Sequence, residues 1–410
     1  MSRIITSQPT LNISPELAIN QSNWDHPEHL AIGQLTMEQL FKTVSVDRGC
    51  NTMPLPQADQ HWPLDDEIFS DILRPERTIT AEQFLNRRLF NDALLIVHRG
   101  KVVHESYRNG MSAQDRHVIH SCTKSLISIL VRQAVERRLL DPSAEIGAYV
   151  PELAALDAWG SVTLQQVWNM QAGINYSEDY TDPGAHYWSY ARSAGYYPPL
   201  AGESVLGVKK WIFNNLTERS QRPGEEFLYN SCLTNVLGMA LESVYRQPLV
   251  EIFEQQFYRH VGAEMDGYFN TDHLGFPIAE GQLSLSLRDF ARCAWALANE
   301  GRSLTGEHLF SPEFPAMLAT PSVEAQKIYQ RLQPDKVFPQ GQYSHQYWGV
   351  DTVQRQFSML GIHGQFAWFD LDNDVFAVGV GSFPQQDGEL MMLCLKELWQ
   401  RISAQAKIQR

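Results

Sequence analysis

The chain has 410 residues, of which 43% are hydrophobic, and it carries a formal net charge of −14. This apolar content is enough for a large core in one domain or in two interleaved domains. The acidic balance excludes nucleic acid and anionic membrane surfaces as expected partners. No run of about 18 apolar residues predicts a membrane-spanning helix.

The first residues and the cysteines indicate the compartment. The opening M-S-R-I-I-T-S-Q-P has neither the apolar region nor the cleavage pattern of a secretory signal. Five cysteines are scattered without a C-x-x-C pair, which argues against a zinc site or a disulfide framework. We therefore expect reduced thiols in a cytoplasmic protein, with no metal and no cofactor.

The N-terminal quarter divides into an arm and a hairpin. Residues 1–80 are rich in Pro, Asn, Gln and Asp. They are interpreted as an irregular arm with a short helix near T-M-E-Q-L-F-K. The run A-L-L-I-V-H-R-G-K-V-V-H-E-S-Y, residues 93–107, has two β-branched segments around Arg99-Gly100-Lys101. This pattern predicts a β-hairpin.

Helical patterns dominate the middle of the chain. After the polar quartet S-C-T-K, residues 121–124, apolar residues recur every three or four positions as far as Leu139. This spacing predicts a buried helix that stops near Leu140-Asp141-Pro142, since proline cannot continue it. Residues 150–285 are mostly helical in pattern, and L-T-N-V-L-G-M-A-L-E-S-V and L-R-D-F-A-R-C-A-W-A-L-A-N-E-G are the clearest helices.

The C-terminal part predicts strands and a last helix. Strand patterns run from 346 to 383, as three predicted strands at residues 347–353, 357–370 and 375–383. The run E-L-M-M-L-C-L-K-E-L-W-Q-R predicts an amphipathic helix. Leu371-Asp372-Asn373-Asp374 is interpreted as a hairpin turn rather than a calcium loop, because the full ligand set is missing.

Strands at both ends with helices between them predict an α+β fold, in which N- and C-terminal segments build one antiparallel sheet. The expected domains are a sheet domain, residues 81–145 and 285–410, and an inserted, mainly helical domain, residues 146–284.

The S-C-T-K quartet also suggests chemistry. Three residues of helix turn by about 300° and rise by about 4.5 Å, so Ser121 and Lys124 share one face. The helix N-terminus stabilises negative charge, and apolar surroundings lower a lysine pKa, so Lys124 could accept the proton of Ser121. The alternative is that Ser121 only caps the helix and Lys124 is solvated.

Two further segments carry candidate residues. Tyr229-Asn230-Ser231 precedes a predicted helix, and Tyr229 could relay protons. Alternatively, Tyr229 is a core aromatic and Ser231 is a helix cap. The segment M-L-G-I-H-G-Q, residues 359–365, has two glycines on a predicted strand, which allow a ligand to approach the backbone or merely form bulges. His117 and His120 are interpreted as structural.

From about residue 90 to the C-terminus the chain resembles the serine β-lactamase and penicillin-binding superfamily. The motifs that carry this resemblance are S-C-T-K, N-M-Q-A-G-I-N-Y-S-E-D-Y-T-D-P, Y-N-S with L-T-N-V-L-G, and G-F-P-I-A-E-G-Q-L-S-L-S-L-R-D-F-A-R. They are most similar to class C β-lactamases, related esterases and the 6-aminohexanoate-dimer (nylon-oligomer) hydrolases.

The resemblance implies residue roles and a β-lactamase/transpeptidase-like fold. Ser121 would be the nucleophile, Lys124 its base and Tyr229 the general acid/base. The backbone N–H groups of Ser121 and Ile362 would form the oxyanion hole. The implied substrate contacts are Tyr180, then Tyr176, together with Ser231, Gly361 and His363.

The chain departs from the family where β-lactams bind. The family's Y-x-N ends here in Ser231, and Met359-Leu360-Gly361 stand where Lys-Thr-Gly is expected. Loss of that carboxylate-binding pair argues against β-lactamase activity and favours an apolar wall at Met359 and Leu360. Glu178, Asp179 and Asp182 would disfavour anionic substrates if their loop faces the site.

The function expected from the sequence is a serine hydrolase for small-molecule esters or linear amides. The alternatives are a β-lactamase or D-alanyl-D-alanine peptidase-like enzyme and a non-catalytic acyl-binding protein. A homodimer remains open.

Overall fold

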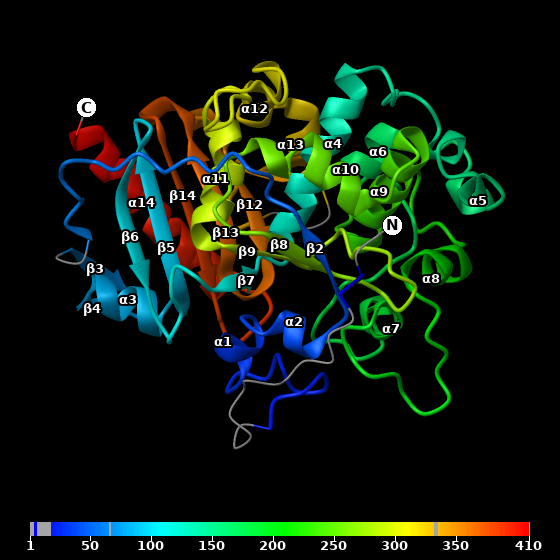
Figure 1. The fold of residues 1–410 in the computed structure, drawn as a ribbon, viewed down its shortest axis with the longest axis horizontal. Helices are drawn as coiled ribbons and strands as arrows, with labels where there is room; N and C mark the ends of the chain where they lie inside the picture. The colour runs from blue at the N-terminus through cyan, green and yellow to red at the C-terminus, as the bar shows by residue number, and fades with distance from the viewer. Residues whose placement is uncertain (1–3, 6–17, 65–66, 332–334, 410) are drawn as a thin grey trace.

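The computed structural model describes residues 4–5, 18–64, 67–331 and 335–409 (Figure 1). Its largest sheet has seven antiparallel strands in the order β10-β11-β12-β13-β14-β5-β6. The strands of this sheet are β5 (Asn91–His98), β6 (Lys101–Tyr107), β10 (Gln342–Ser344), β11 (Tyr347–Asp351), β12 (Gln356–Gly361), β13 (Gln365–Asp370) and β14 (Val375–Gly381). An N-terminal hairpin and five C-terminal strands thus form one sheet, which confirms the predicted α+β class.

The β5–β6 hairpin is confirmed, and its turn explains why these residues form it. Arg99 and Gly100 both have positive φ, 49° and 69°. This backbone twist matches that of the two strands, and glycine adopts it without strain. The turn Leu371–Asp374 likewise joins β13 to β14 as a hairpin, with the Asp370 side chain accepting a hydrogen bond from the Asn373 N–H.

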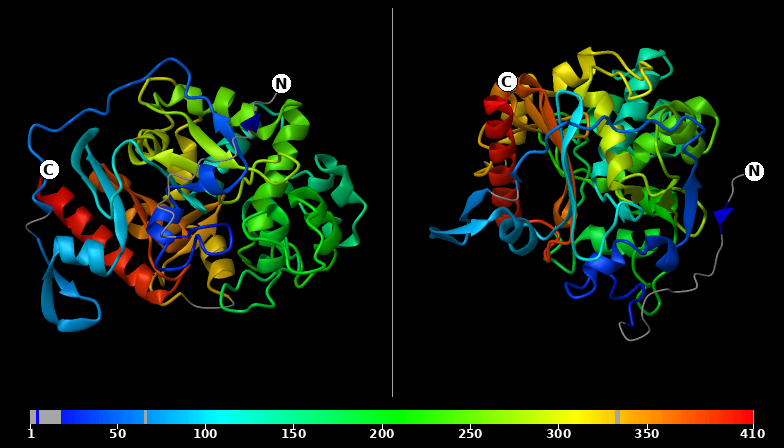
Figure 2. Two further views of the ribbon diagram at one scale, coloured as in Figure 1. Left: turned by 60° about the horizontal axis from the view of Figure 1, so that its bottom comes forward. Right: turned by 60° about the vertical axis from the view of Figure 1, so that its left-hand side comes forward.

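Both faces of the large sheet are covered (Figure 2). Alternate residues of β5 point to opposite faces: Leu94 and Ile96 pack on one cluster, and Leu95 packs on the other. The first face lies under α3 (Ala81–Arg87) and α14 (Glu389–Ile408), and the second lies under α4 (Cys122–Glu136) and α11 (Leu287–Ala298).

A second sheet and a group of helices complete the fold. The small antiparallel sheet has the order β1-β2-β8-β9-β7. Its strands are β1 (Ile4–Ile5), β2 (Thr43–Val46), β7 (Arg116–Val118), β8 (Gly267–Asn270) and β9 (Leu283–Ser286). The remaining α-helices are α1 (Leu30–Gly33), α2 (Met37–Leu40), α5 (Pro151–Ala154), α6 (Leu164–Trp168), α7 (His186–Ala194), α8 (Val208–Asn215), α9 (Ser231–Tyr245), α10 (Leu249–Gln256), α12 (Glu313–Leu318) and α13 (Val323–Tyr329).

The first 80 residues hold more regular structure than an irregular arm suggests. The expected short helix is α2, but the segment also contains α1, strand β2 of the small sheet, and a hairpin of β3 (Ile68–Asp71) and β4 (Arg74–Thr80). Part of the segment, residues 1–3, 6–17 and 65–66, lies outside the described residues. The division into a sheet domain and an inserted helical domain stays a prediction.

Two predicted boundaries are wrong. Helix α4 ends at Glu136 rather than near Leu140, because Arg138 takes a left-handed φ of 59°, and Leu139 is consequently exposed. The pattern over 357–370 is two strands, since positive φ at His363 and Gly364 turns the chain back on itself. Among the helices that the structure describes, none combines the length and apolarity that crossing a membrane requires.

Candidate active site

Ser121 lies where the chain passes from β7 into α4. It occupies the N-cap position of α4, yet its side chain makes no capping hydrogen bond. The N–H groups of Cys122 and Thr123 bond instead to the carbonyls of Ile119 and His120. The Ser121 hydroxyl is therefore available to other partners, and the capping alternative is wrong.

Lys124 is buried one turn further along α4. Its side chain is 2% exposed, and Nζ lies 2.7 Å from Ser121 Oγ and 2.5 Å from the carbonyl oxygen of Glu280. Burial lowers the pKa of the Lys124 ammonium, and the carboxylates of Glu178 and Glu280 partly oppose this. The solvated-lysine alternative is therefore wrong, and burial shifts Lys124 towards the neutral amine.

Tyr229 lies against the lysine. Lys124 Nζ is 5.1 Å from the centre of the Tyr229 ring, whose other neighbours include the stacked Trp348 at 5.6 Å. Burial raises the pKa of the Tyr229 phenol well above its usual value, and a side-chain hydrogen bond with Ser121 opposes the shift. The phenol thus holds its proton close to the serine oxygen.

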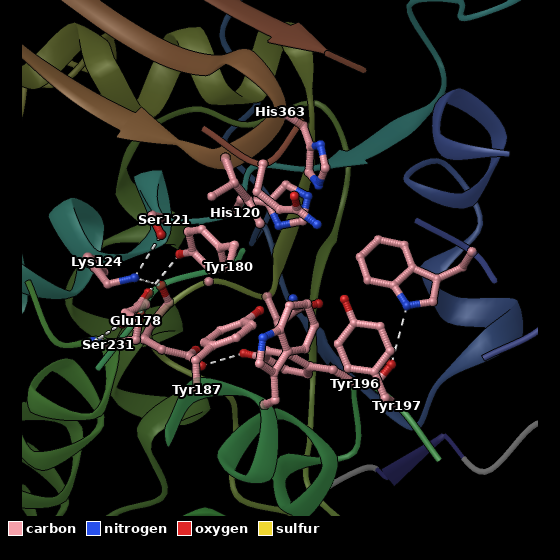
Figure 3. Close-up of a pocket in the computed structure, with 17 residues that line it drawn as sticks. His120, Ser121, Lys124, Glu178, Tyr180, Tyr187, Tyr196, Tyr197, Ser231 and His363 are labelled. Carbon is pink, nitrogen blue, oxygen red and sulfur yellow. Dashed lines mark hydrogen bonds between the residues drawn. The ribbon is translucent and has the colours of Figure 1, made fainter. Parts of the chain in front are cut away.

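Ser231 begins α9 but does not cap it. Asn230 is the N-cap and accepts a hydrogen bond from the Cys232 N–H. Both the N–H and the hydroxyl of Ser231 donate to Glu178, at 2.8 and 2.6 Å. The Tyr180 hydroxyl donates to the same carboxylate at 2.8 Å. Glu178 therefore fixes Ser231 and Tyr180 beside the serine and lysine (Figure 3).

The acidic loop is divided between site and solvent. Glu178 lines the cavity, whereas Asp179 and Asp182 are exposed and accept hydrogen bonds within their own turns. The loop therefore adds one carboxylate to the site rather than three.

One cavity is lined by Ser121, Lys124, Glu178, Tyr180 and Ser231, whereas Tyr229 packs against Lys124 and is not among its lining residues. Figure 3 shows Ser121 and Lys124 near one end and Tyr196 and Tyr197 towards the other. The cavity is lined by Trp24, His120, Ser121, Lys124, Glu178, Tyr180, Tyr187, Trp188, Tyr196, Tyr197, Ser231, Glu280, Gly281, Gln282, Ile362, His363 and Gln386. Six of its lining residues are tryptophan or tyrosine and two are histidine, and its charged groups are one lysine and two carboxylates.

Glu280 is a buried carboxylate that sequence reasoning missed. Its side chain is 2% exposed, and Oε1 accepts hydrogen bonds from the hydroxyls of Tyr190 and Tyr196. Among the described residues, no partner satisfies Oε2. Burial raises the pKa of Glu280, while Lys124 opposes the shift. The signal was present in P-I-A-E-G-Q, where a charged residue interrupts an otherwise buried segment.

The β12–β13 hairpin reaches the site through its turn. A Cβ at Gly361 would lie 2.9 Å from the carbonyl oxygen of Ile119 and 3.1 Å from His120 Cβ, so the glycine lets two backbones approach closely. Ile362 and His363 line the cavity. The His363 N–H donates to the carbonyl of Gln386.

The expected wall at Met359 and Leu360 is wrong. Met359 is fully buried in the core between sheet and helices, and Leu360 packs on the opposite face, because consecutive strand residues alternate. Of the two candidate loop tyrosines, Tyr180 lines the cavity, whereas Tyr176 packs behind it against His186 and Trp211.

The two histidines that were interpreted as structural, His117 and His120, lie in different surroundings. His117 is fully buried, with Nε2 3.5 Å from an Asp92 oxygen. His120 lines the cavity, and its Nε2 pairs with the Gln34 side chain at 3.1 Å. Burial lowers the pKa of His120 well below its usual value, so the ring is neutral.

Within the described ranges, no cluster of three or more His, Cys, Asp and Glu side chains could hold a metal ion. All five cysteines are free thiols, and Cys50 alone is exposed.

Comparison with known proteins identifies the class. The family model described as Beta-lactamase matches residues 77–382, which is well over half of the chain. The chain therefore belongs to the β-lactamase family, as the sequence motifs predicted.

Individual relatives show which members of the family the chain is similar to. The chain is 31% identical over 365 residues to the 6-aminohexanoate-dimer hydrolase of Paenarthrobacter ureafaciens, a match that covers 89% of this chain and 88% of the relative. It also matches the solved structure of a Bacillus anthracis protein provisionally named a 6-aminohexanoate-dimer hydrolase, with a TM-score of 0.83, 20% identity and coverage of 98% and 99%. A family VIII carboxylesterase matches with a TM-score of 0.54 and 15% identity, covering 78% of this chain and 95% of its own.

Proposed function

We propose that the protein is a serine hydrolase that cleaves esters or linear amides through an acyl-enzyme. The observation that carries this proposal is the 2.7 Å contact between the buried Lys124 amine and the Ser121 hydroxyl. A desolvated lysine with a lowered pKa is the kind of base that activates a serine.

The first half-reaction forms the acyl-enzyme. Lys124 takes the proton as Ser121 Oγ adds to the substrate carbonyl carbon, giving a tetrahedral oxyanion. The N–H groups of Ser121 and Ile362 are assigned to bind that oxyanion. The carbonyl re-forms as the bond to the alcohol or amine breaks, and Tyr229 donates the proton that the leaving group needs. Lys124 then reprotonates Tyr229.

The second half-reaction releases the acid. Water adds to the acyl carbon while the Tyr229–Lys124 pair accepts its proton. The bond to Ser121 Oγ breaks, and the serine recovers that proton. Glu178 supports both steps by fixing Ser231 and Tyr180 beside the reacting groups.

The charged residues that line the cavity predict which substrate charges the site accepts. Glu178 and Glu280 line it, and the residues that stand where the family's carboxylate-binding lysine and threonine are expected, Met359 and Leu360, do not. We expect neutral and amine-bearing acyl groups to react well, and penicillins and cephalosporins to react poorly. The 6-aminohexanoate dimer in the name of the Paenarthrobacter relative is built from an amine-bearing acid, which fits this expectation.

The charge preference can be checked by measuring kcat/KM at low and high salt. The substrates should have equal length and end in a neutral group, an amine or a carboxylate. A preference for the carboxylate series, or fast turnover of nitrocefin, would contradict it.

The test of the proposed function is Ser121→Ala, measured against p-nitrophenyl esters and linear amides. Loss of the nucleophile should lower kcat by about 10³-fold or more. Retention of most activity would reject the mechanism. A wild-type protein that bound these compounds without turnover would instead support the acyl-binding alternative.

A further inference from the structure

Part of the cavity wall comes from a segment outside the matched family region. We define residues 18–34 as the N-terminal strap; it precedes the family match, which begins at residue 77. Its Trp24 lines the cavity and is only 3% exposed. The strap is therefore part of the site, although it lies about 100 residues before Ser121 in the sequence.

Trp24 is held against the aromatic end of the cavity. Its indole Nε1 donates to the Tyr196 carbonyl at 3.2 Å, and its ring stacks on Tyr197 with centroids 6.3 Å apart. The Tyr197 hydroxyl in turn donates to Asp25, also in the strap. On its other side the indole stacks on His120 at 6.2 Å. Three direct contacts thus fix the indole as a wall, and the Tyr197–Asp25 bond supports one of them.

The strap is seated on the same elements that position Ser121. The Gln34 side chain accepts hydrogen bonds from His120 and from Gln365 of β13, and its backbone carbonyl accepts one from the Val118 N–H of β7. A Cβ at Gly33 would lie 2.1 Å from the Trp24 carbonyl oxygen, so α1 packs directly on the Trp24 backbone. The position of Trp24 relative to Ser121 is therefore fixed.

The cavity runs from Ser121 and Lys124 towards Tyr196 and Tyr197 (Figure 3). An acyl chain on Ser121 that extends along this direction would meet the wall that Trp24 shares. We propose that Trp24 sets the maximum substrate length that the site accepts. This inference rests on the proposed function of the same cavity and adds a specificity-determining residue from the strap.

Replacing Trp24 with a smaller residue should favour substrates with longer acyl chains. Each methylene group that gains a buried position contributes about 0.8 kcal/mol, which corresponds to about a fourfold gain in kcat/KM per group. Trp24→Ala should therefore move the optimum of a p-nitrophenyl ester series, acetyl to decanoyl, towards longer acyl chains. Trp24→Phe, which keeps an aromatic wall, should give a smaller move in the same direction.

Trp62 offers a matched control in the same part of the chain. It is 4% exposed and its indole also donates one hydrogen bond, to Gln409, but it packs on the α14 face of the large sheet. Trp62→Ala should lower stability and leave the length profile unchanged. Equal losses at every length in both Trp24 variants, or an unchanged profile, would overturn the proposal.

A binding measurement separates this inference from the proposed function. Straight-chain N-methyl amides of the same acyl lengths can be titrated by calorimetry into Ser121→Ala and into Ser121→Ala with Trp24→Ala or Trp24→Phe. The variants that lack Trp24 should bind the longer amides more tightly relative to the shorter ones. An unchanged binding profile would reject Trp24 as the length limit even if turnover proceeds, whereas a shifted profile without turnover would reject only the proposed hydrolysis.

Discussion

At the scale of single residues, burial and nearby charges act in opposite directions on the pKa of Lys124. Burial lowers the pKa of Lys124, and Glu178 and Glu280 raise it again. Tyr229 keeps its proton because burial raises the pKa of its phenol. A neutral amine beside a protonated phenol is the arrangement that lets one group accept a proton while the other donates one.

Lys124 and Tyr229 should behave as one proton-transfer unit. Each single variant, Lys124→Ala or Tyr229→Phe, should lower kcat strongly, and the double variant should be about as slow as the slower single one. Steady-state kinetics of the wild type, the two single variants and the double variant measure the coupling between the two side chains. Fully multiplicative losses would show that the two side chains act separately.

Glu280 should set the pH range of the reaction. With Lys124 as the proposed base, activity should rise with pH as the amine loses its proton, and the lowered pKa should place this rise below the usual lysine range. Glu280→Gln removes a negative charge that favours the protonated amine. The rise in kcat/KM should therefore move to lower pH. A pH profile that stays in place or moves upward would contradict this electrostatic role.

At the scale of elements, the site forms where the turn between β12 and β13 meets the start of α4. The approach depends on Gly361, whose φ of −134° is ordinary extended backbone, so its role is to leave space rather than to adopt a rare conformation. The same turn carries Ile362 and His363 into the cavity. Close packing of these two elements fixes the Ile362 backbone relative to Ser121.

Gly361→Ala should therefore impair catalysis by moving the turn. The added Cβ would lie 2.9 Å from the Ile119 carbonyl oxygen, which is backbone and cannot rotate away. We expect kcat to fall by about 10- to 100-fold, the scale of effect of a displacement near 1 Å.

Gly160→Ala is the matched control for that variant, since its Cβ would meet only the Asp157 carbonyl oxygen at 3.6 Å, an ordinary contact. Circular dichroism should show both variants folded. Equal kcat for the two would contradict the role assigned to the turn.

At the scale of the whole molecule, local patterns predicted local structure well. The β5–β6 hairpin, the start of α4 and the C-terminal helix follow from turn residues and apolar periodicity. The Ser121–Lys124 contact was predictable for the same reason, because both residues lie in one helical turn. The end of helix α4 was predicted too late, because the left-handed φ at Arg138 that ends the helix leaves no clear signal in the apolar pattern.

Contacts between distant segments were not predictable from one sequence. Trp24 reaches the cavity from the N-terminal strap, and Glu280 reaches it from the segment between β8 and β9. Met359 was misplaced because the phase of a strand depends on what covers each face of the sheet. These placements depend on tertiary packing, which periodicity along the chain does not encode.

The most direct test of the central claim is to trap the acyl-enzyme. The protein is mixed with a p-nitrophenyl ester, quenched in acid within the first turnovers, digested and mapped by mass spectrometry. We predict an added acyl mass on the peptide that contains Ser121, and no such mass in Ser121→Ala. Ester hydrolysis without any adduct, or an adduct on another residue that persists in Ser121→Ala, would contradict the assignment of Ser121 as the nucleophile.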